Sequence, residues 1–165
     1  RELTEQETET LKAAAAAAGL KEKAVSLLSG RLMSAGQLEE KLRARGADPV
    51  QAEEISAWAQ RIGLLNEEEY AKAVVRQGQA KGWGFYRIKQ ELYRRQVPRV
   101  YWEESLAELE APDEAVDRFL RSRLSDPTDR KQVKKASDAL ARRGFSWQDI
   151  AAGIERARRG EWEEA

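Results

Sequence analysis

Cysteine and histidine are both absent from the 165-residue chain. Their absence excludes disulfide bonds, the usual zinc ligands and the catalysis that depends on these two side chains. No apolar run approaches the roughly 18 residues that span a bilayer, and the segment LKAAAAAAGL follows an acidic lead where a secretory signal would carry Lys or Arg. We therefore expect a cytoplasmic monomer that is not an enzyme and binds neither a membrane nor a cofactor. Because the chain begins with Arg1, we also expect an N-terminal piece to be missing or processed.

Helix start and stop signals recur along the chain, and no segment alternates as a strand would. Short polar residues that can cap a helix precede several apolar segments, at Ser34, Asp48, Asn66, Asp126 and Ser146. Glycines that can end a helix follow others, at Gly46, Gly63 and Gly144. This pattern predicts an all-α protein with helices at 22–32, 35–45, 49–62, 67–80, 85–96, 98–110, 113–125, 128–143 and 147–159, and an additional Ala-rich helix at 8–18.

Three segments of similar pattern begin at Gln37, Arg87 and Lys135. Their apolar positions align as Leu38, Ile88 and Ala136, and then as Leu42, Leu92 and Leu140. Each segment closes with an arginine and a turn residue, which are Arg45 and Gly46, Arg95 and Gln96, and Arg143 and Gly144. The repetition predicts three tandem three-helix units in an elongated array, because each unit is too small to bury its apolar face alone. The predicted boundaries are an N-terminal extension at 1–20 and repeats at 21–64, 65–111 and 112–165.

Acidic and basic residues number 29 each, but they are unevenly distributed. Residues 71–95 contain seven basic residues and one acidic residue, whereas residues 96–120 contain two basic and seven acidic residues. The repeated arginines lie in the last turn of a helix, where exposed carbonyl groups attract a cation. The glutamates of NEEE lie at a helix start, where the partial positive charge of the exposed amides attracts an anion. Lys81, Arg87 and Lys89 lie near a helix start instead, where positive charge is unfavourable. An acidic or polyanionic partner would explain them.

The segment KGWGFYRIKQELYRR, which begins at Lys81, combines this charge with glycine and aromatic residues. Trp83, Tyr86 and Tyr93 can stack on bases or pack on a partner, although core packing is the favoured alternative for Phe85 and Tyr93. The two glycines permit a tight turn that leaves helix amides open to phosphate, a weak signal without a preceding strand. The candidate contact residues are a first group, Lys81, Trp83, Arg87, Lys89, Arg94 and Arg95, and a second patch, Lys131, Lys134, Lys135, Arg142 and Arg143.

The segment LLNEEEYAKAVVRQGQAKGWGFYRIKQELYRRQVP resembles the central signature of the RecX family, bacterial regulators of the recombinase RecA. The segments AVSLLSGRLMSAGQLEEKLRARG and ALARRGFSWQDI resemble the first and third repeats of that family, so the resemblance covers about residues 22–158. One departure is Gln96, where the family usually has glycine. The resemblance implies three three-helix repeats that form a curved, elongated body and lie in the groove of a RecA filament on DNA.

In function, the resemblance implies binding to RecA filaments on single- or double-stranded DNA and, mostly, inhibition of filament extension, ATPase, strand exchange and co-protease activity. These activities belong to DNA repair, homologous recombination and the SOS response. Two other functions fit the residues. The chain is alternatively a helical module that binds DNA directly, or a helical-repeat adaptor for another protein.

Small-angle scattering tests the tandem arrangement. A compact globule of this length has a radius of gyration of about 15 Å, and units arranged in a row have a clearly larger value. A measured radius close to the compact value would contradict the tandem arrangement.

Overall fold

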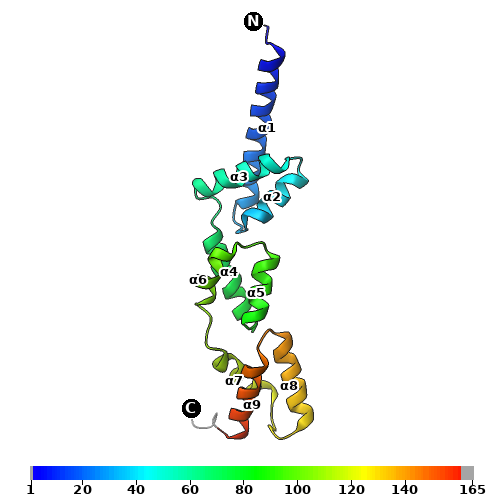
Figure 1. Ribbon diagram of the computed structural model, residues 1–165, viewed down its shortest axis with the longest axis vertical. Helices are drawn as coiled ribbons and strands as arrows, with labels where there is room; N and C mark the ends of the chain where they lie inside the picture. The colour runs from blue at the N-terminus through cyan, green and yellow to red at the C-terminus, as the bar shows by residue number, and fades with distance from the viewer. Residues whose placement is uncertain (1, 161–165) are drawn as a thin grey trace. The chain divides into compact units, whose positions relative to one another are not determined.

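The computed structural model describes residues 2–160, and every regular element within that range is helical (Figure 1). This confirms the all-α prediction. In chain order the elements are α1 (Glu5–Leu28), α2 (Ala35–Ala44), α3 (Pro49–Arg61), α4 (Glu67–Ala80), α5 (Phe85–Arg94), the 3-10 turn η1 (Arg99–Tyr101), α6 (Trp102–Leu106), α7 (Pro112–Arg123), α8 (Arg130–Arg142) and α9 (Trp147–Arg158).

The chain divides into two compact units. The first unit comprises the residues up to Tyr70 together with Arg95–Pro98, and the second comprises Ala71–Arg94 and the chain from Arg99 onward. The predicted three-repeat boundaries are finer than this division and stay a prediction.

Burial follows the repeat pattern of the sequence. The aligned apolar residues are all at most 4% exposed: Leu38, Ile88 and Ala136, and then Leu42, Leu92 and Leu140. In the first unit they belong to a core that α1, α2 and α3 share, and in the second unit α7, α8 and α9 enclose a separate core. Helix α4 packs closely on α5, since a Cβ added at Gly78 would lie 2.6 Å from Ile88 Cγ1. The three aligned helices, α2, α5 and α8, therefore each bury the apolar stripe that the spacing of these residues predicts.

The predicted caps form at four helix starts. Ser34 and Asp48 each make a reciprocal capping box with the glutamine three residues later. The side chain of Ser146 accepts a hydrogen bond from Asp149 N, and the side chain of Asn66 accepts one from Glu69 N. These side chains satisfy backbone N–H groups that have no partner within the helix.

Three helix predictions were wrong in extent. Helix α1 is continuous where two helices were predicted, because Gly19 is tolerated inside it and the chain turns only after Leu28. The segment predicted as one helix at 98–110 forms only η1 and the short α6. Asp126 caps a turn instead of a helix, since its Oδ1 accepts a hydrogen bond from Thr128 N at 2.9 Å, and α8 starts after Asp129.

Glu67 joins three elements of the first unit. Its side chain is only 6% exposed, and it accepts hydrogen bonds from Ala35 N at 3.1 Å and from Gln60 Nε2 at 2.7 Å. Glu67 therefore caps the start of α2 in addition to opening its own helix, which the NEEE motif did not predict. Burial raises the pKa of this carboxyl above its ordinary value, although the two hydrogen bonds oppose the shift.

Left-handed residues follow all three aligned helices. Gly46, Gln96 and Gly144 have φ angles of 101°, 59° and 96°. Gln96 thus adopts the backbone conformation that glycine usually supplies, at a cost of about 1–2 kcal/mol for a residue with a Cβ. Its side chain compensates by packing over Gly36, where an added Cβ would lie 2.5 Å from Gln96 Oε1, and by donating a hydrogen bond to Glu40 at 3.1 Å.

The same kind of joint is built twice around these left-handed residues. In the first unit, Ser34 Oγ at the start of α2 donates a hydrogen bond to Arg95 O at 2.7 Å. In the second unit, Gly84 N and Tyr86 N at the start of α5 donate to the carbonyl groups of Arg143 and Gly144, at 2.7 Å and 3.1 Å. Donors at one helix start thereby satisfy the unpaired carbonyl groups at another helix end.

The joint in the second unit predicts an unequal response to alanine at two left-handed glycines. Gly46→Ala meets no atom within 4 Å and should cost only the conformational penalty of about 1–2 kcal/mol. Gly144→Ala has a similar φ angle, but its Cβ would lie 2.4 Å from Arg87 N, which adds about 1–3 kcal/mol of overpacking. Urea unfolding should show the larger loss for Gly144→Ala, and equal losses would contradict the joint.

The buried carboxyl of Glu67 predicts a pH dependence. Because the folded state raises its pKa above the ordinary value of 4.5, the folded protein binds more protons than the unfolded chain in that pH range. The stability that the protonated carboxyl contributes is therefore lost as the pH rises through the raised pKa. Relative to Glu67→Gln, the wild type should lose free energy of unfolding as the pH rises above the ordinary value of 4.5 and through the raised pKa, and two parallel pH profiles would contradict this account.

Candidate functional site

The turn between α4 and α5 positions the aromatic and basic residues of the candidate site. Gly82 has a φ of 78°, which closes the end of α4 and lets Trp83 N donate a hydrogen bond to Gly78 O at 2.9 Å. The backbone then enters α5 at once, so that Arg87 and Lys89 lie in its first two turns. The two glycines that flank Trp83 thus place its ring beside the basic start of α5.

Three cations lie over aromatic rings in this segment. Lys81 Nζ and Arg87 Cζ are 4.9 Å and 4.2 Å from the centre of the Trp83 ring, and Lys89 Nζ is 5.1 Å from the centre of the Phe85 ring. Such contacts orient a cation without neutralising its charge.

The end of α8 approaches the same turn through the backbone of Arg142 and the side chain of Arg143. Arg87 Nη1 donates to Arg142 O at 3.4 Å, and the Arg143 guanidinium lies 4.8 Å from the centre of the Phe119 ring. Arg143 also approaches the turn, since a Cβ at Gly82 would lie 2.4 Å from its Nη1. Part of the second predicted patch therefore meets part of the first, and we call Lys81, Arg87, Lys89, Arg142 and Arg143 the cationic cluster.

None of these five cations forms an ion pair with a carboxylate of the described chain. Elsewhere the basic residues are commonly neutralised, as in the pairs of Arg94 with Glu91 and Lys134 with Asp138. Arg156 forms a bidentate contact with Asp117. Lys131 and Lys135 likewise have no ion pair within the described chain, so the cluster is distinguished by the aromatic rings that lie against four of its cations.

The remaining predicted contact residues lie apart from the cluster. Lys131, Lys134 and Lys135 are exposed in the first half of α8, and Arg94 is exposed near the end of α5. Arg95 belongs to the first unit, where its carbonyl group accepts the hydrogen bond from Ser34. The helix-end explanation is confirmed for Arg45, whose side chain donates to Lys41 O in the last turn of α2.

Two expectations about this segment were wrong. Tyr93 and Phe85 were favoured as core residues, but their side chains are 69% and 41% exposed, whereas Trp83 is half-buried beneath its cations. Two of the amides expected to be open to phosphate at the start of α5 are also engaged, because Gly84 N and Tyr86 N donate to carbonyl groups after α8. The aromatic contact surface therefore comes from α5 rather than from the turn.

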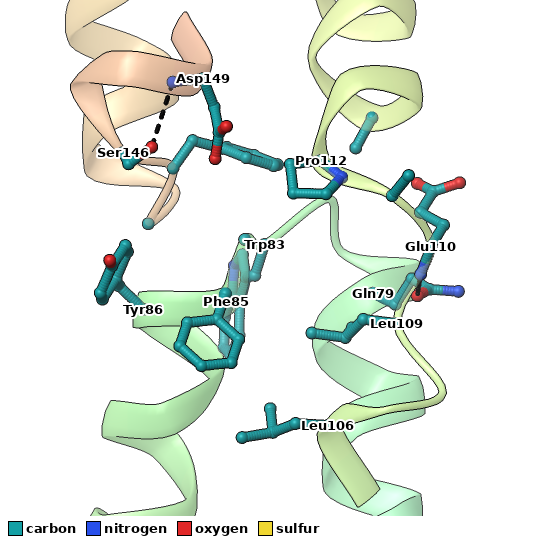
Figure 2. A pocket seen from close by; sticks show the side chains of 15 residues that line it. Gln79, Trp83, Phe85, Tyr86, Leu106, Leu109, Glu110, Pro112, Ser146 and Asp149 are labelled. Atoms are coloured by element: carbon teal, nitrogen blue, oxygen red, sulfur yellow. Dashed lines mark hydrogen bonds between the residues drawn. The ribbon is translucent and has the colours of Figure 1, made fainter. Parts of the chain in front are cut away.

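A pocket of about 400 Å³ adjoins the cluster within the second unit (Figure 2). The turn before α5, the connection between α6 and α7, and the start of α9 supply its walls. Sequence reasoning missed several of its residues, which include Leu106, Leu109, Glu110, Pro112, Phe145 and Asp149. No local signal could have identified them, because they converge only through the packing of the second unit.

Between residues 2 and 160, no group of three or more acidic side chains is arranged to hold a metal ion. Within the same range, each helix is too short or too polar to cross a membrane.

Comparison with known proteins identifies the family. A sequence model described as the second three-helix domain of RecX matches residues 66–106. The regulatory protein RecX of Halorhodospira halophila is 32% identical over 143 residues, which cover 85% of this chain and 89% of the relative. This chain belongs to the RecX family. A second RecX regulatory protein, from Xanthomonas axonopodis pv. citri, is 34% identical over 134 residues, which cover 79% of this chain and 83% of the relative.

Solved structures agree on the fold. The crystal structure of RecX from Lactobacillus salivarius matches with a TM-score of 0.73 and 22% identity over 87% of this chain and 97% of the other. A second RecX crystal structure matches with a TM-score of 0.78 and 19% identity, covering 93% of this chain and 80% of the other. The chain thus has the RecX fold, and its relatives are regulatory proteins, in agreement with the expectation of a protein that is not an enzyme.

Proposed function

We propose that this RecX-family chain binds RecA filaments assembled on DNA and inhibits their extension, ATPase, strand exchange and co-protease activity. Family membership supports a regulatory role directed at RecA. The observation that carries the proposal is the cationic cluster, because its five cations lie on adjoining segments of the second unit and have no carboxylate partner in the described chain, on a protein with no net charge.

The fixed geometry of the cluster favours binding to an ordered partner. Arg87 and Lys81 are held against Trp83, and Arg143 is held against Phe119, so these side chains lose little conformational entropy when they bind. A nucleoprotein filament presents phosphate groups and acidic protein side chains together. Inhibition then follows from occupying the filament groove, without any catalytic step.

Charge reversal tests the role of the cluster. Lys81→Glu combined with Lys89→Glu breaks no described hydrogen bond, because both lysines contact only aromatic rings. The two introduced glutamates should repel the phosphate groups and acidic side chains of the filament. Inhibition of DNA-dependent ATP hydrolysis by RecA should therefore weaken about tenfold or more. Lys12→Glu combined with Arg31→Glu is the matched control, since both residues are exposed in the first unit and the change in net charge is the same.

The control should inhibit like the wild type, and circular dichroism should show unchanged helicity in both variants. Equal inhibition by the two double variants would place the contact surface elsewhere. A wild type that fails to slow ATP hydrolysis at any ratio to RecA would refute the proposed function itself.

Direct DNA binding is the second candidate function, and the exposed Lys131, Lys135 and Arg142 of α8 favour it. A protein that neutralises several phosphate groups loses affinity steeply with salt, with a slope of about −0.7 per phosphate on single strands. Binding to bare single strands with such a slope, and no tighter binding to filaments, would favour this alternative.

A further inference from the structure

The pocket beside the cationic cluster is an apolar recess with aromatic walls. Trp83, Phe85 and Phe145 line it together with Leu106 and Leu109. Figure 2 shows Leu109 pointing across the recess toward Phe85. Its volume of about 400 Å³ is large enough to receive one large apolar side chain.

Exposed aromatic residues border the recess. Phe85 and Tyr86 are 41% and 55% exposed, and their rings meet edge to face at 5.4 Å between centres. Rigid, partly exposed aromatic rings around a recess are typical of the anchor sites that dominate protein–protein interfaces.

Carboxylates, rather than cations, face this recess. Glu110 is held by Arg118, and its backbone N–H donates to Gln79 Oε1 at 3.0 Å, so both groups are engaged. Asp149 lies in the first turn of α9, and its carboxylate has no partner within the described chain. Figure 2 shows this carboxylate on the α9 side of the recess. The recess therefore offers an apolar volume and one unpaired negative charge.

We propose that the recess binds a segment of a protein partner in which a large apolar side chain is followed by lysine or arginine. The apolar side chain fills the space between Phe85 and Leu109, and the cation pairs with Asp149. A nucleic acid is disfavoured as the occupant because its phosphate groups would approach two carboxylates. If the proposed function holds, the segment belongs to RecA. The cationic cluster then contacts anionic groups that lie beside this segment on the filament.

A pair of dipeptides tests the recess without any recombinase. N-acetyl-Trp-Lys-amide, titrated into the isotope-labelled full chain, should shift the amide signals of Ala115, Gly144 and Phe145. N-acetyl-Trp-Glu-amide should bind about two- to fivefold more weakly, as expected for one exposed ion pair. The substitution Asp149→Asn should remove this difference. Absent shifts at the three amides, or equal affinities for the two peptides in the wild type, would overturn the proposal.

A filling substitution tests the recess on the filament. Ala115→Trp occupies the recess from α7 and should lower the affinity for RecA filaments about tenfold or more. Ala152→Trp on the exposed face of α9 is the control and should bind like the wild type. Binding of both variants to bare oligothymidylate should be unchanged.

The outcomes separate the recess from the proposed function. Filament binding that is equal in Ala115→Trp and the wild type would overturn the recess as a filament contact and leave the proposed function standing. An equal loss on bare oligothymidylate would show that a base is the occupant and would also overturn it. If the wild type does not bind RecA filaments, the proposed function fails together with the assignment of the segment to RecA. The dipeptide titration still decides whether the recess binds an apolar side chain next to a cation.

Discussion

The pairing of helix starts with helix ends is the interaction on which the rest of the structure depends. Gly84 N and Tyr86 N donate to the carbonyl groups that follow α8, and Ser34 Oγ does the same for the carbonyl of Arg95. Each pairing satisfies polar groups that a helix cannot satisfy internally, and in the second unit it brings the start of α5 to the end of α8, where the two helix dipoles have opposite sign. A left-handed residue, Gln96 or Gly144, follows the carbonyl-bearing end in each pairing and turns the chain there, so that the donors can reach the carbonyl groups.

This joint also explains where the cations gather. The end of a helix favours arginine, as at α8, and the start of α5 carries Arg87 and Lys89. The joint between the end of α8 and the start of α5 therefore concentrates positive charge in the second unit. Trp83 and Phe119 reduce the repulsion by placing ring faces under the cations. The cluster is consequently a product of the joint, and the adjoining recess lies along the same seam between α5, α7 and α9.

Gln96 shows how one joint tolerates a departure from glycine. A left-handed glutamine is strained, yet its side chain covers Gly36 and bonds to Glu40, both of which lie on the helix that the joint caps. The absence of a Cβ at position 36 makes this packing possible. Glycine at the equivalent Gly144 has a different reason, because Arg87 leaves no room for a Cβ there. The same turn is therefore maintained by different contacts in the two units.

Local patterns in the sequence specify the helical class, most helix starts and ends, and the buried stripe of each aligned helix, because caps, left-handed glycines and 3.6-residue periodicity are local properties. The sequence also identified Lys81, Arg87 and Lys89 as unusual, since their positive charge is unfavourable near a helix start. Packing between distant helices determines that the end of α8 and the Arg143 side chain lie at the turn before α5, that Tyr93 is exposed and that Asp149 faces a recess. These features depend on contacts between residues some 50 or more positions apart, and no local pattern specifies which helix end meets which helix start.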